Sequence, residues 1–194
     1  MRGTVGTWVN SQWKYQATLG QFSVTINSFV HQNPRDGLRL DITAGGNISE
    51  PLMAKGVRNY DILRSLALEW LERVEIDPRR IDYLAGTFSG GMQQRLQIAR
   101  NLVSRPQVLL MDEPTGGLDV SVQARLLDLL RSIVWELGIA VIIVTHDLAV
   151  ARTLADRLIV MRRGRIVESG LTDQILDDPQ QPYSQLLVSS ALRI

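Results

Sequence analysis

The sequence predicts an α/β fold with a mainly parallel sheet flanked by helices, and three observations predict it. Residues 108–111 and 139–144 are short apolar runs without alternation, as in strands covered on both faces. Residues 121–137 lie between these runs, carry apolar side chains at helical spacing and end at Gly138, a usual helix stop. A strand, a helix and a second buried strand in this order are typical of parallel sheets.

The chain before residue 108 is predicted to be mostly helical. A helix is expected from a cap at Asp61 to Asp77-Pro78, because six apolar residues fall on one stripe. These are Leu63, Leu66, Ala67, Trp70, Leu71 and Val74. Residues 90–103 predict a second helix. Residues 21–30 alternate loosely, which predicts a strand.

Two polar, glycine-containing stretches predict interruptions. Asn33-Pro34-Arg35-Asp36-Gly37 has loop chemistry, because proline restricts the residue before it and Asp-Gly favours a turn. Ala44-Gly45-Gly46-Asn47 predicts another break between elements.

Further elements are predicted after residue 144. Asp147 is expected to cap a helix that ends at residue 155. Residues 157–161 and 165–169 predict a hairpin around Gly164. Two short helices are expected to follow, over residues 172–176 and 183–192.

Composition excludes several classes of protein. The chain has 194 residues, of which 45% are hydrophobic, enough for one domain with a sizeable core. Its 21 basic and 20 acidic residues give no field that recruits nucleic acid, so no nucleic-acid partner is expected. The absence of cysteine excludes disulfides, thiolate metal sites and a cysteine nucleophile. The longest apolar run, residues 139–144, is far too short to span a membrane, and no secretory signal is recognised. A cytoplasmic location is therefore expected.

Ser89-Gly90-Gly91 opens the predicted helix over residues 90–103. The first turn of a helix has uncovered N–H groups and partial positive charge, and glycine lets a ligand approach the backbone. The stretch therefore predicts a site for an anion such as phosphate. The alternative is a serine cap followed by flexible glycines.

Asp112 and Glu113 follow the apolar run over residues 108–111. The carboxyl end of a buried strand is where α/β sheets place ligands. One carboxylate can hold Mg²⁺ while the other orients and deprotonates an attacking water. The alternative is an acidic turn that caps the next helix. His146 follows the second run and is expected at the same edge of the sheet, in reach of a phosphate, or else as a structural histidine.

The order and spacing of these motifs resemble the ATP-binding cassette ATPases. Ser89-Gly90-Gly91 is similar to the family signature, with Met92 where glutamine is commoner. Residues 109–112 are similar to the Walker B strand, and Glu113 to the catalytic glutamate. His146 resembles the switch histidine.

Two further matches complete the resemblance, which covers about residues 29–194. Gln32 is similar to the Q-loop glutamine, and Leu118-Asp119 to the D-loop. The resemblance implies ATP and Mg²⁺ as cofactors, with Asp112 and Gln32 at the metal. It also implies Gln32 and Asp119 at the nucleotide, and the signature at a nucleotide held by a second ATPase subunit in a head-to-tail dimer.

The resemblance divides the chain into parts. Residues 33–88 would form the Q-loop and a helical subdomain, and residues 89–170 the stretch from signature to switch. Residues 171–194 would form a C-terminal helical tail. Residues 1–28 stay unassigned, as an atypical segment.

One motif of the family is absent from the 194 residues. A cassette cradles phosphates with a G-x-x-x-x-G-K-[ST] loop, whereas the lysines here, Lys14 and Lys55, follow no such pattern. We therefore expect the N-terminal part of the cassette to be missing and ATP binding to be impaired. The missing part supplies sheet strands in the family, so we also expect residues 139–144 to lack a strand neighbour on one side.

Two other stretches narrow the expected function. Residues 178–187 resemble the tail of ATPases from peptide and nickel importers. Residues 29–38 and 44–48 look closer to the branch that serves phosphonate carbon–phosphorus lyase. The first expectation is an ATPase subunit of phosphonate breakdown with soluble lyase subunits as partners. The alternatives are the ATPase of a peptide or nickel importer, with a membrane permease as partner, and a non-catalytic interaction module or gene remnant.

Overall fold

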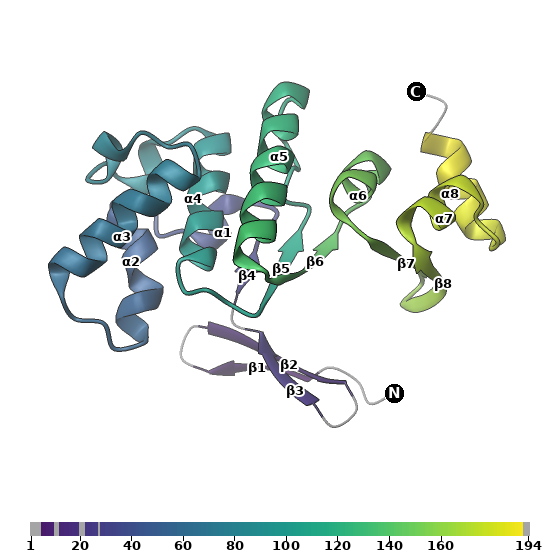
Figure 1. The fold of residues 1–194 in the computed structure, drawn as a ribbon, viewed down its shortest axis with the longest axis horizontal. Helices are drawn as coiled ribbons and strands as arrows, with labels where there is room; N and C mark the ends of the chain where they lie inside the picture. The colour runs from purple at the N-terminus through teal and green to yellow at the C-terminus, as the bar shows by residue number, and fades with distance from the viewer. Residues whose placement is uncertain (1–4, 10–11, 20–21, 27, 192–194) are drawn as a thin grey trace. The chain divides into compact units, whose positions relative to one another are not determined.

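The computed structural model describes residues 5–9, 12–19, 22–26 and 28–191. The chain forms two compact units, Met1–Ile142 and Ile143–Ile194, and each is described here by itself. The labels of the helices and strands are those of Figure 1.

The first unit begins with three antiparallel strands, β1 (Val5–Val9), β2 (Gln12–Leu19) and β3 (Phe22–Ile26). They lie in the order β1-β2-β3. The strand predicted over residues 21–30 therefore divides into β3 and a second strand, β4 (Phe29–Val30), with residues 21 and 27 outside the described part. The hairpin of β1 and β2 was not predicted.

The second sheet has the order β4-β5-β6 and confirms the predicted α/β class. β5 (Val108–Asp112) pairs in parallel with β4 and buries Leu109 and Met111. α5 (Val120–Leu137) then leads to β6 (Ala140–Val144), and Gly138 ends α5 at a φ of 61°. The predicted strand, helix and glycine cap are confirmed.

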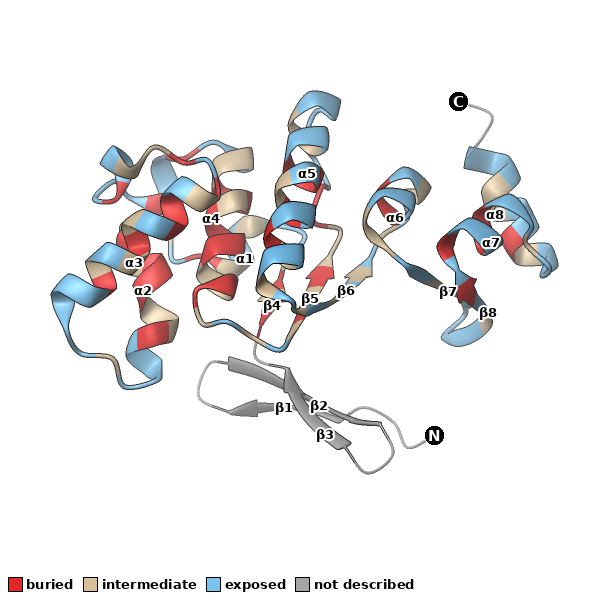
Figure 2. Ribbon diagram, in the orientation of Figure 1, coloured by how far each residue is buried: buried red, intermediate tan, exposed pale blue. Residues whose placement is uncertain are grey.

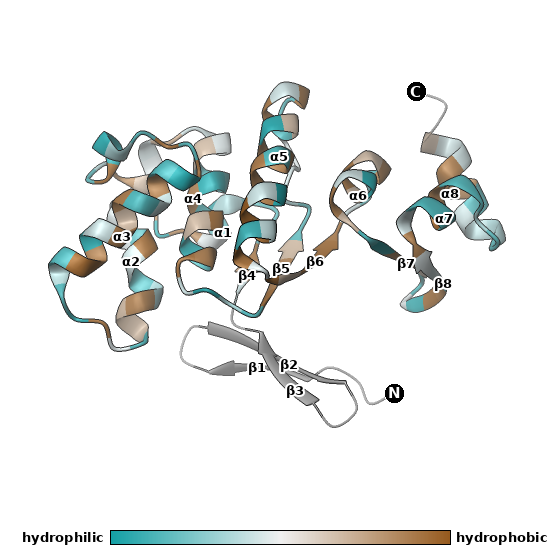
Figure 3. Ribbon diagram, in the orientation of Figure 1, coloured by the Kyte–Doolittle hydropathy of each residue, from teal (hydrophilic) through white to brown (hydrophobic). Residues whose placement is uncertain are grey.

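The prediction that residues 139–144 are buried on both faces is wrong. β6 is apolar along its length (Figure 3), yet Ile142 is 53% exposed and Val144 60% exposed. Its residues alternate between exposed and half-buried (Figure 2). β6 is the last strand in the sheet order, so among the described strands it has a neighbour on one side only. Apolar composition alone does not show whether a neighbour covers a strand.

Three helices form most of the rest of the first unit: α2 (Ala44–Ala54), α3 (Tyr60–Arg73) and α4 (Gly90–Leu102). The short 3-10 helices η1 (Pro78–Arg80) and η2 (Ala85–Thr87) connect α3 to α4. α2 packs against both α3 and α4, and their facing residues are buried (Figure 2). The helix predicted over residues 90–103 is confirmed to within one residue.

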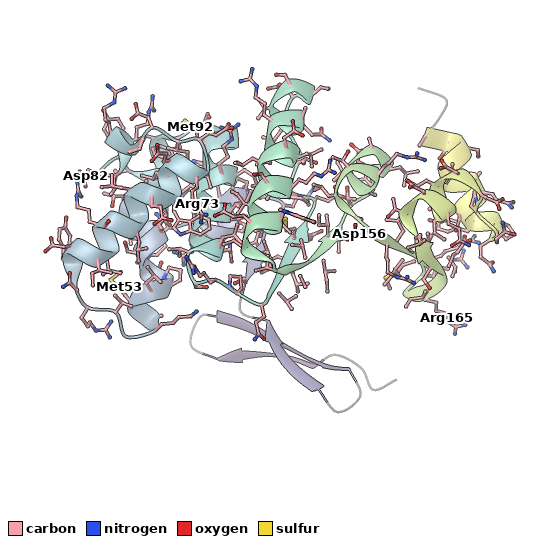
Figure 4. The ribbon with its side chains drawn as sticks, in the orientation of Figure 1. Met53, Arg73, Asp82, Met92, Asp156 and Arg165 are labelled. Carbon is pink, nitrogen blue, oxygen red and sulfur yellow. The ribbon has the colours of Figure 1, made fainter. Side chains whose placement is uncertain are left out.

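The predicted ends of α3 need correction. Asn59, not Asp61, caps the helix, because its Oδ1 accepts a hydrogen bond from the Ile62 N–H at 3.1 Å. The helix ends at Arg73, before Asp77, which instead caps η1. Arg73, labelled in Figure 4, lies over the Trp70 ring at 4.9 Å and forms an ion pair with Glu136, which links α3 to α5.

Both predicted interruptions are helix starts. Pro34–Gly37 forms a one-turn helix, α1, and Asn33 Oδ1 accepts from the Arg35 N–H at 3.1 Å. Thr43 caps α2 by accepting from the Gly46 N–H at 3.1 Å. A Cβ on Gly45 would lie 2.6 Å from Ile81 Cγ1, so glycine here permits close packing rather than a break.

The second unit follows the prediction closely. Asp147 caps α6 (Leu148–Leu154), and β7 (Arg157–Arg162) and β8 (Arg165–Leu171) form an antiparallel hairpin. α7 (Thr172–Asp177) and α8 (Pro182–Ala191) follow, with residue 192 outside the described part. Nowhere in the described chain is there a helix with the length and apolar character needed to cross a bilayer.

Candidate functional site

Asp112 is the last residue of β5, and Glu113 begins the turn after it. Glu113 has a φ of 43°, in the left-handed region that non-glycine residues seldom adopt. Both carboxylates are half-buried, and the next two residues, Pro114 and Thr115, are buried. Unusual backbone geometry of this kind gathers at functional sites. Asp112 has strand geometry and Glu113 a positive φ, so their side chains project in different directions. This difference suits one carboxylate to the metal and the other to the water.

His31 extends the neighbouring strand β4 and stands beside this end of the sheet. Its ring packs edge to face on Phe29 at 4.6 Å between ring centres. Burial lowers the pKa of His31, while the charges of Asp36 and Asp112 oppose that shift. The charge of the candidate metal ligand Asp112 therefore acts on the protonation of this imidazole. We did not predict His31, although it directly precedes Gln32 and is one of only two histidines in the chain.

Gln32 is exposed and lies next to the turn that follows β5. A Cβ built on Gly116 would lie 3.5 Å from Gln32 Cγ and 3.6 Å from its Nε2. The structure therefore brings Gln32 to the segment that joins β5 to α5, as its predicted role requires.

A pocket of about 450 Å³ lies between these segments and the start of α4. It brings together Gln32, Gly90 and Leu118, which precedes Asp119. The full lining is Gln32, Asn33, Pro34, Arg35, Phe88, Gly90, Gln93, Gln94, Gly116, Gly117 and Leu118. This pocket was not predicted, because its walls come from segments far apart in sequence.

Ser89 caps α4, as the alternative interpretation of this stretch predicted. Its Oγ accepts from the Met92 N–H at 3.4 Å and its carbonyl from the Gln93 N–H at 2.8 Å. A Cβ on Gly90 would meet no atom within 4 Å, so its backbone faces open space. A Cβ on Gly91 would lie 3.2 Å from Val122 Cγ1, so Gly91 instead packs against α5. The open start of a 13-residue helix suits an anion, consistent with the predicted phosphate contact.

Asp119 has a structural role in the chain as described. Its carboxylate caps α5 by accepting from the Val122 N–H at 3.0 Å and from Ser121 Oγ at 2.7 Å. The hydrogen bond from Ser121, followed by that from Val122, lowers the pKa of Asp119. This carboxylate is exposed, and a contact with nucleotide stays a prediction.

His146 belongs to the second unit, where it is exposed just before the cap of α6. The structure does not relate the second unit to Asp112 and Glu113. The predicted place of His146 beside the carboxylates therefore stays a prediction.

The side chains near Asp112 suit Mg²⁺, which needs few protein ligands, better than a metal ion that needs a complete set of protein ligands. Within the described residues, no three histidine or acidic side chains gather to hold a metal. Mg²⁺ is usually bound by one or two carboxylates together with waters and phosphate oxygens. Asp112 can supply the carboxylate and Gln32 an amide oxygen, and the remaining ligands would come from nucleotide and water.

Comparison with known proteins decides the family. The family model described as ABC transporter matches residues 6–116, more than half of the chain. The chain belongs to the ABC transporter family. The match begins inside the stretch of residues 1–28 that the motifs left unassigned.

Curated members of the family extend this finding. The chain is 69% identical over 164 residues to the phosphonates utilization ATP-binding protein PhnK of Escherichia coli K12, covering 84% of the chain and 65% of PhnK. It is 38% identical over 165 residues to the dipeptide transport ATP-binding protein DppF of the same organism, covering 85% of the chain and 49% of DppF. The chain thus spans about two thirds to one half of the length of these relatives.

Solved structures of the family share the fold. The chain is similar to CbiO1 of Clostridium perfringens, part of the ABC transporter complex CbiONQ, with a TM-score of 0.70 and 28% identity over 86% of the chain and 63% of CbiO1. The ATP-binding cassette MJ0796, a dimer bound to ADP and Pi, gives a TM-score of 0.67 and 27% identity over 84% of the chain and 74% of MJ0796. The resemblance drawn from the motifs is confirmed, and the P-loop NTPase class with it.

Proposed function

We propose that the chain supplies the carboxylates, the Q-loop glutamine and the signature segment of an ABC-type ATPase subunit that serves phosphonate breakdown. One observation supports this most: Gln32 lies against the turn that follows Asp112 and Glu113. ATP hydrolysis needs metal, water and phosphate ligands close together. Asp112 and Gln32 offer ligands for the metal, and Glu113 offers a base for the water, at one end of the sheet.

Each residue has a stated task in this proposal. Asp112 would hold Mg²⁺ with help from Gln32, and the bound ion would supply positive charge against the phosphates. Glu113 orients the attacking water and takes its proton, as a positioned general base. His146 donates a hydrogen bond to the terminal phosphate. Ser89, Gly90 and Gly91 serve the nucleotide of a second ATPase subunit, with Asp119 near the same interface.

The 194-residue chain is expected to bind ATP weakly by itself. It has no G-x-x-x-x-G-K-[ST] loop, and Lys55 is engaged elsewhere, since its Nζ donates to the Ser104 carbonyl at 2.8 Å. Hydrogen bonds to charged groups contribute roughly 1.5–3 kcal/mol each, so lacking three removes roughly 5–9 kcal/mol. Micromolar binding corresponds to about 8 kcal/mol. Calorimetry with Mg-ATP should show no saturation below about 1 mM, and micromolar binding would disprove this part of the proposal.

The phosphonate role is preferred over peptide import because PhnK is 69% identical to the chain and DppF 38%. Purification of the tagged chain from cells grown on a phosphonate tests this choice. Co-purification of soluble carbon–phosphorus lyase subunits would support it, and co-purification of a membrane permease would favour import. Partner binding without ATP hydrolysis in the assembled complex would favour a non-catalytic module. The proposal places the chain in the cytoplasm, where ATP is available.

A further inference from the structure

One buried side chain of α4 has polar atoms without any partner. Gln94 is 2% exposed, and neither its Nε2 nor its Oε1 makes a hydrogen bond. A buried amide left in this state has given up hydrogen bonds to water and gained none. Native proteins rarely leave such groups unpaired, so Gln94 needs an explanation.

The adjacent Gln93 shows that a buried amide on α4 can find a hydrogen-bond partner. Gln93 is also 2% exposed, but its Nε2 donates to the Ala85 carbonyl at 3.0 Å. This bond ties α4 to η2. Gln94 makes no comparable bond, so it does not hold the fold together in the same way. The two glutamines form a matched pair, one paired and one not.

Gln32 is a candidate partner for Gln94, because the other amides of the pocket are engaged: Asn33 Oδ1 accepts from the Arg35 N–H, and Gln93 Nε2 donates to the Ala85 carbonyl. Both residues line the 450 Å³ pocket, which gives a side chain room to turn. Gln32 is exposed, so its side chain can change rotamer without displacing packed neighbours. Each amide has one acceptor oxygen and an NH₂ donor, so the two can exchange hydrogen bonds reciprocally.

We propose that Gln94 is a positioning residue that hydrogen-bonds the amide of Gln32 across this pocket. The pairing satisfies both polar atoms of Gln94 and fixes one rotamer of Gln32 beside the end of β5. It also joins Gln32 to α4, the helix that begins with Gly90. The inference rests on the proposed function, in which Gln32 contacts metal and nucleotide; Gln94 touches neither and acts through Gln32.

A double-mutant cycle on the full 194-residue chain, without nucleotide, tests the pairing. Gln32→Met, Gln94→Met and the double variant keep side-chain length but remove the amides. With Gln94 present, Q32M should raise the unfolding equilibrium constant in urea about five-fold. In the Q94M background, Q32M should have no effect. Equal effects of Q32M in the two backgrounds would overturn the proposal.

Gln93→Met is the matched control. It should destabilise the chain because the Ala85 carbonyl loses its donor, yet Q32M should keep its about five-fold effect in this background. Loss of the Q32M effect with Q93M as well would also overturn the proposal, because the effect would then not be specific to Gln94.

Side-chain amide NMR gives a readout that stability alone does not. In a chain labelled with ¹⁵N-glutamine, Q32M should shift the Gln94 NH₂ resonances and leave those of Gln93 in place. Unmoved Gln94 resonances would overturn the pairing. Both measurements are made without nucleotide. A failure of ATP hydrolysis would therefore count against the proposed function, whereas the Gln94 pairing is decided by the stability and NMR results alone.

Discussion

Gln32 and Gly116 lie against each other: a Cβ on Gly116 would sit 3.5 Å from Gln32 Cγ. This contact joins the residue that follows His31 to the turn that follows the carboxylates of β5. It depends on the parallel pairing of β4 with β5, in which Val30 lies opposite Met111. Two short strands therefore bring together chemistry that is separated by some eighty residues of sequence.

Gly37 permits a close approach that a larger residue would prevent. A Cβ at this position would lie 2.2 Å from Gln97 Nε2 and 2.9 Å from its Cγ. Gly37→Ala should therefore force the buried Gln97 to move and lower the free energy of unfolding by about 1–3 kcal/mol in urea titrations. Gly90→Ala is the control, because its Cβ would meet nothing within 4 Å and stability should change little. Equal losses in both variants would contradict this explanation.

α5 should show a strong contrast between its two faces. Leu130 is 1% exposed, whereas Trp135 on the same helix is 89% exposed. Leu130→Ala should lower the free energy of unfolding by about 2–5 kcal/mol, because it removes buried contacts and leaves a cavity. Trp135→Ala should change it by at most about 0.5 kcal/mol. A larger loss at Trp135 than at Leu130 would show that α5 is oriented differently.

Asp77 should make stability depend on pH. Hydrogen bonds from the Arg79 side chain, and then from its backbone N–H, lower the pKa of Asp77 to about 2. Because the folded-state pKa is lower than the unfolded one, the stabilisation is present above the unfolded value, about 3.9, and is lost as pH falls toward 2. Asp77→Asn should therefore be less stable than the parent at pH 7, with a small difference because the site is exposed.

Urea titrations of the parent and Asp77→Asn at several pH values check this prediction. The difference between them should shrink steadily between about pH 4 and pH 2. A difference that stays constant across this range would mean that Arg79 does not bind the carboxylate preferentially in the folded chain.

Helices whose ends are set by residues nearby in the sequence were predicted from local patterns. Ser89 and Gly90 at the start of α4, and Gly138 at the end of α5, act within a few residues of their own position. The order of β5, α5 and β6 follows from the same patterns. Gln32, Ser89, Asp112, Glu113, Asp119 and His146 were named from motifs, because these motifs are recognised by residue type and spacing along the chain.

Features that depend on distant contacts were not predicted. Ala44-Gly45-Gly46-Asn47 was expected to be a break, because the sequence does not show that Ile81 packs on Gly45. The edge position of β6 in the described sheet was predicted from the missing phosphate loop, and only the expected burial of its two faces was wrong. The partial burial of His31 and the unpaired amide of Gln94 likewise depend on packing between segments far apart in the chain.

ATP hydrolysis by a chimeric protein tests the central claim most directly. The part of E. coli PhnK that precedes its match to this chain would be joined to residues 29–194, and phosphate release would be measured with Mg-ATP. The chimera should hydrolyse ATP, and Glu113→Gln should slow turnover at least about 100-fold while ATP still binds. Glu72→Gln, an exposed control on α3, should leave turnover unchanged. Undiminished turnover in Glu113→Gln would contradict the assignment of Glu113 and with it the proposed site.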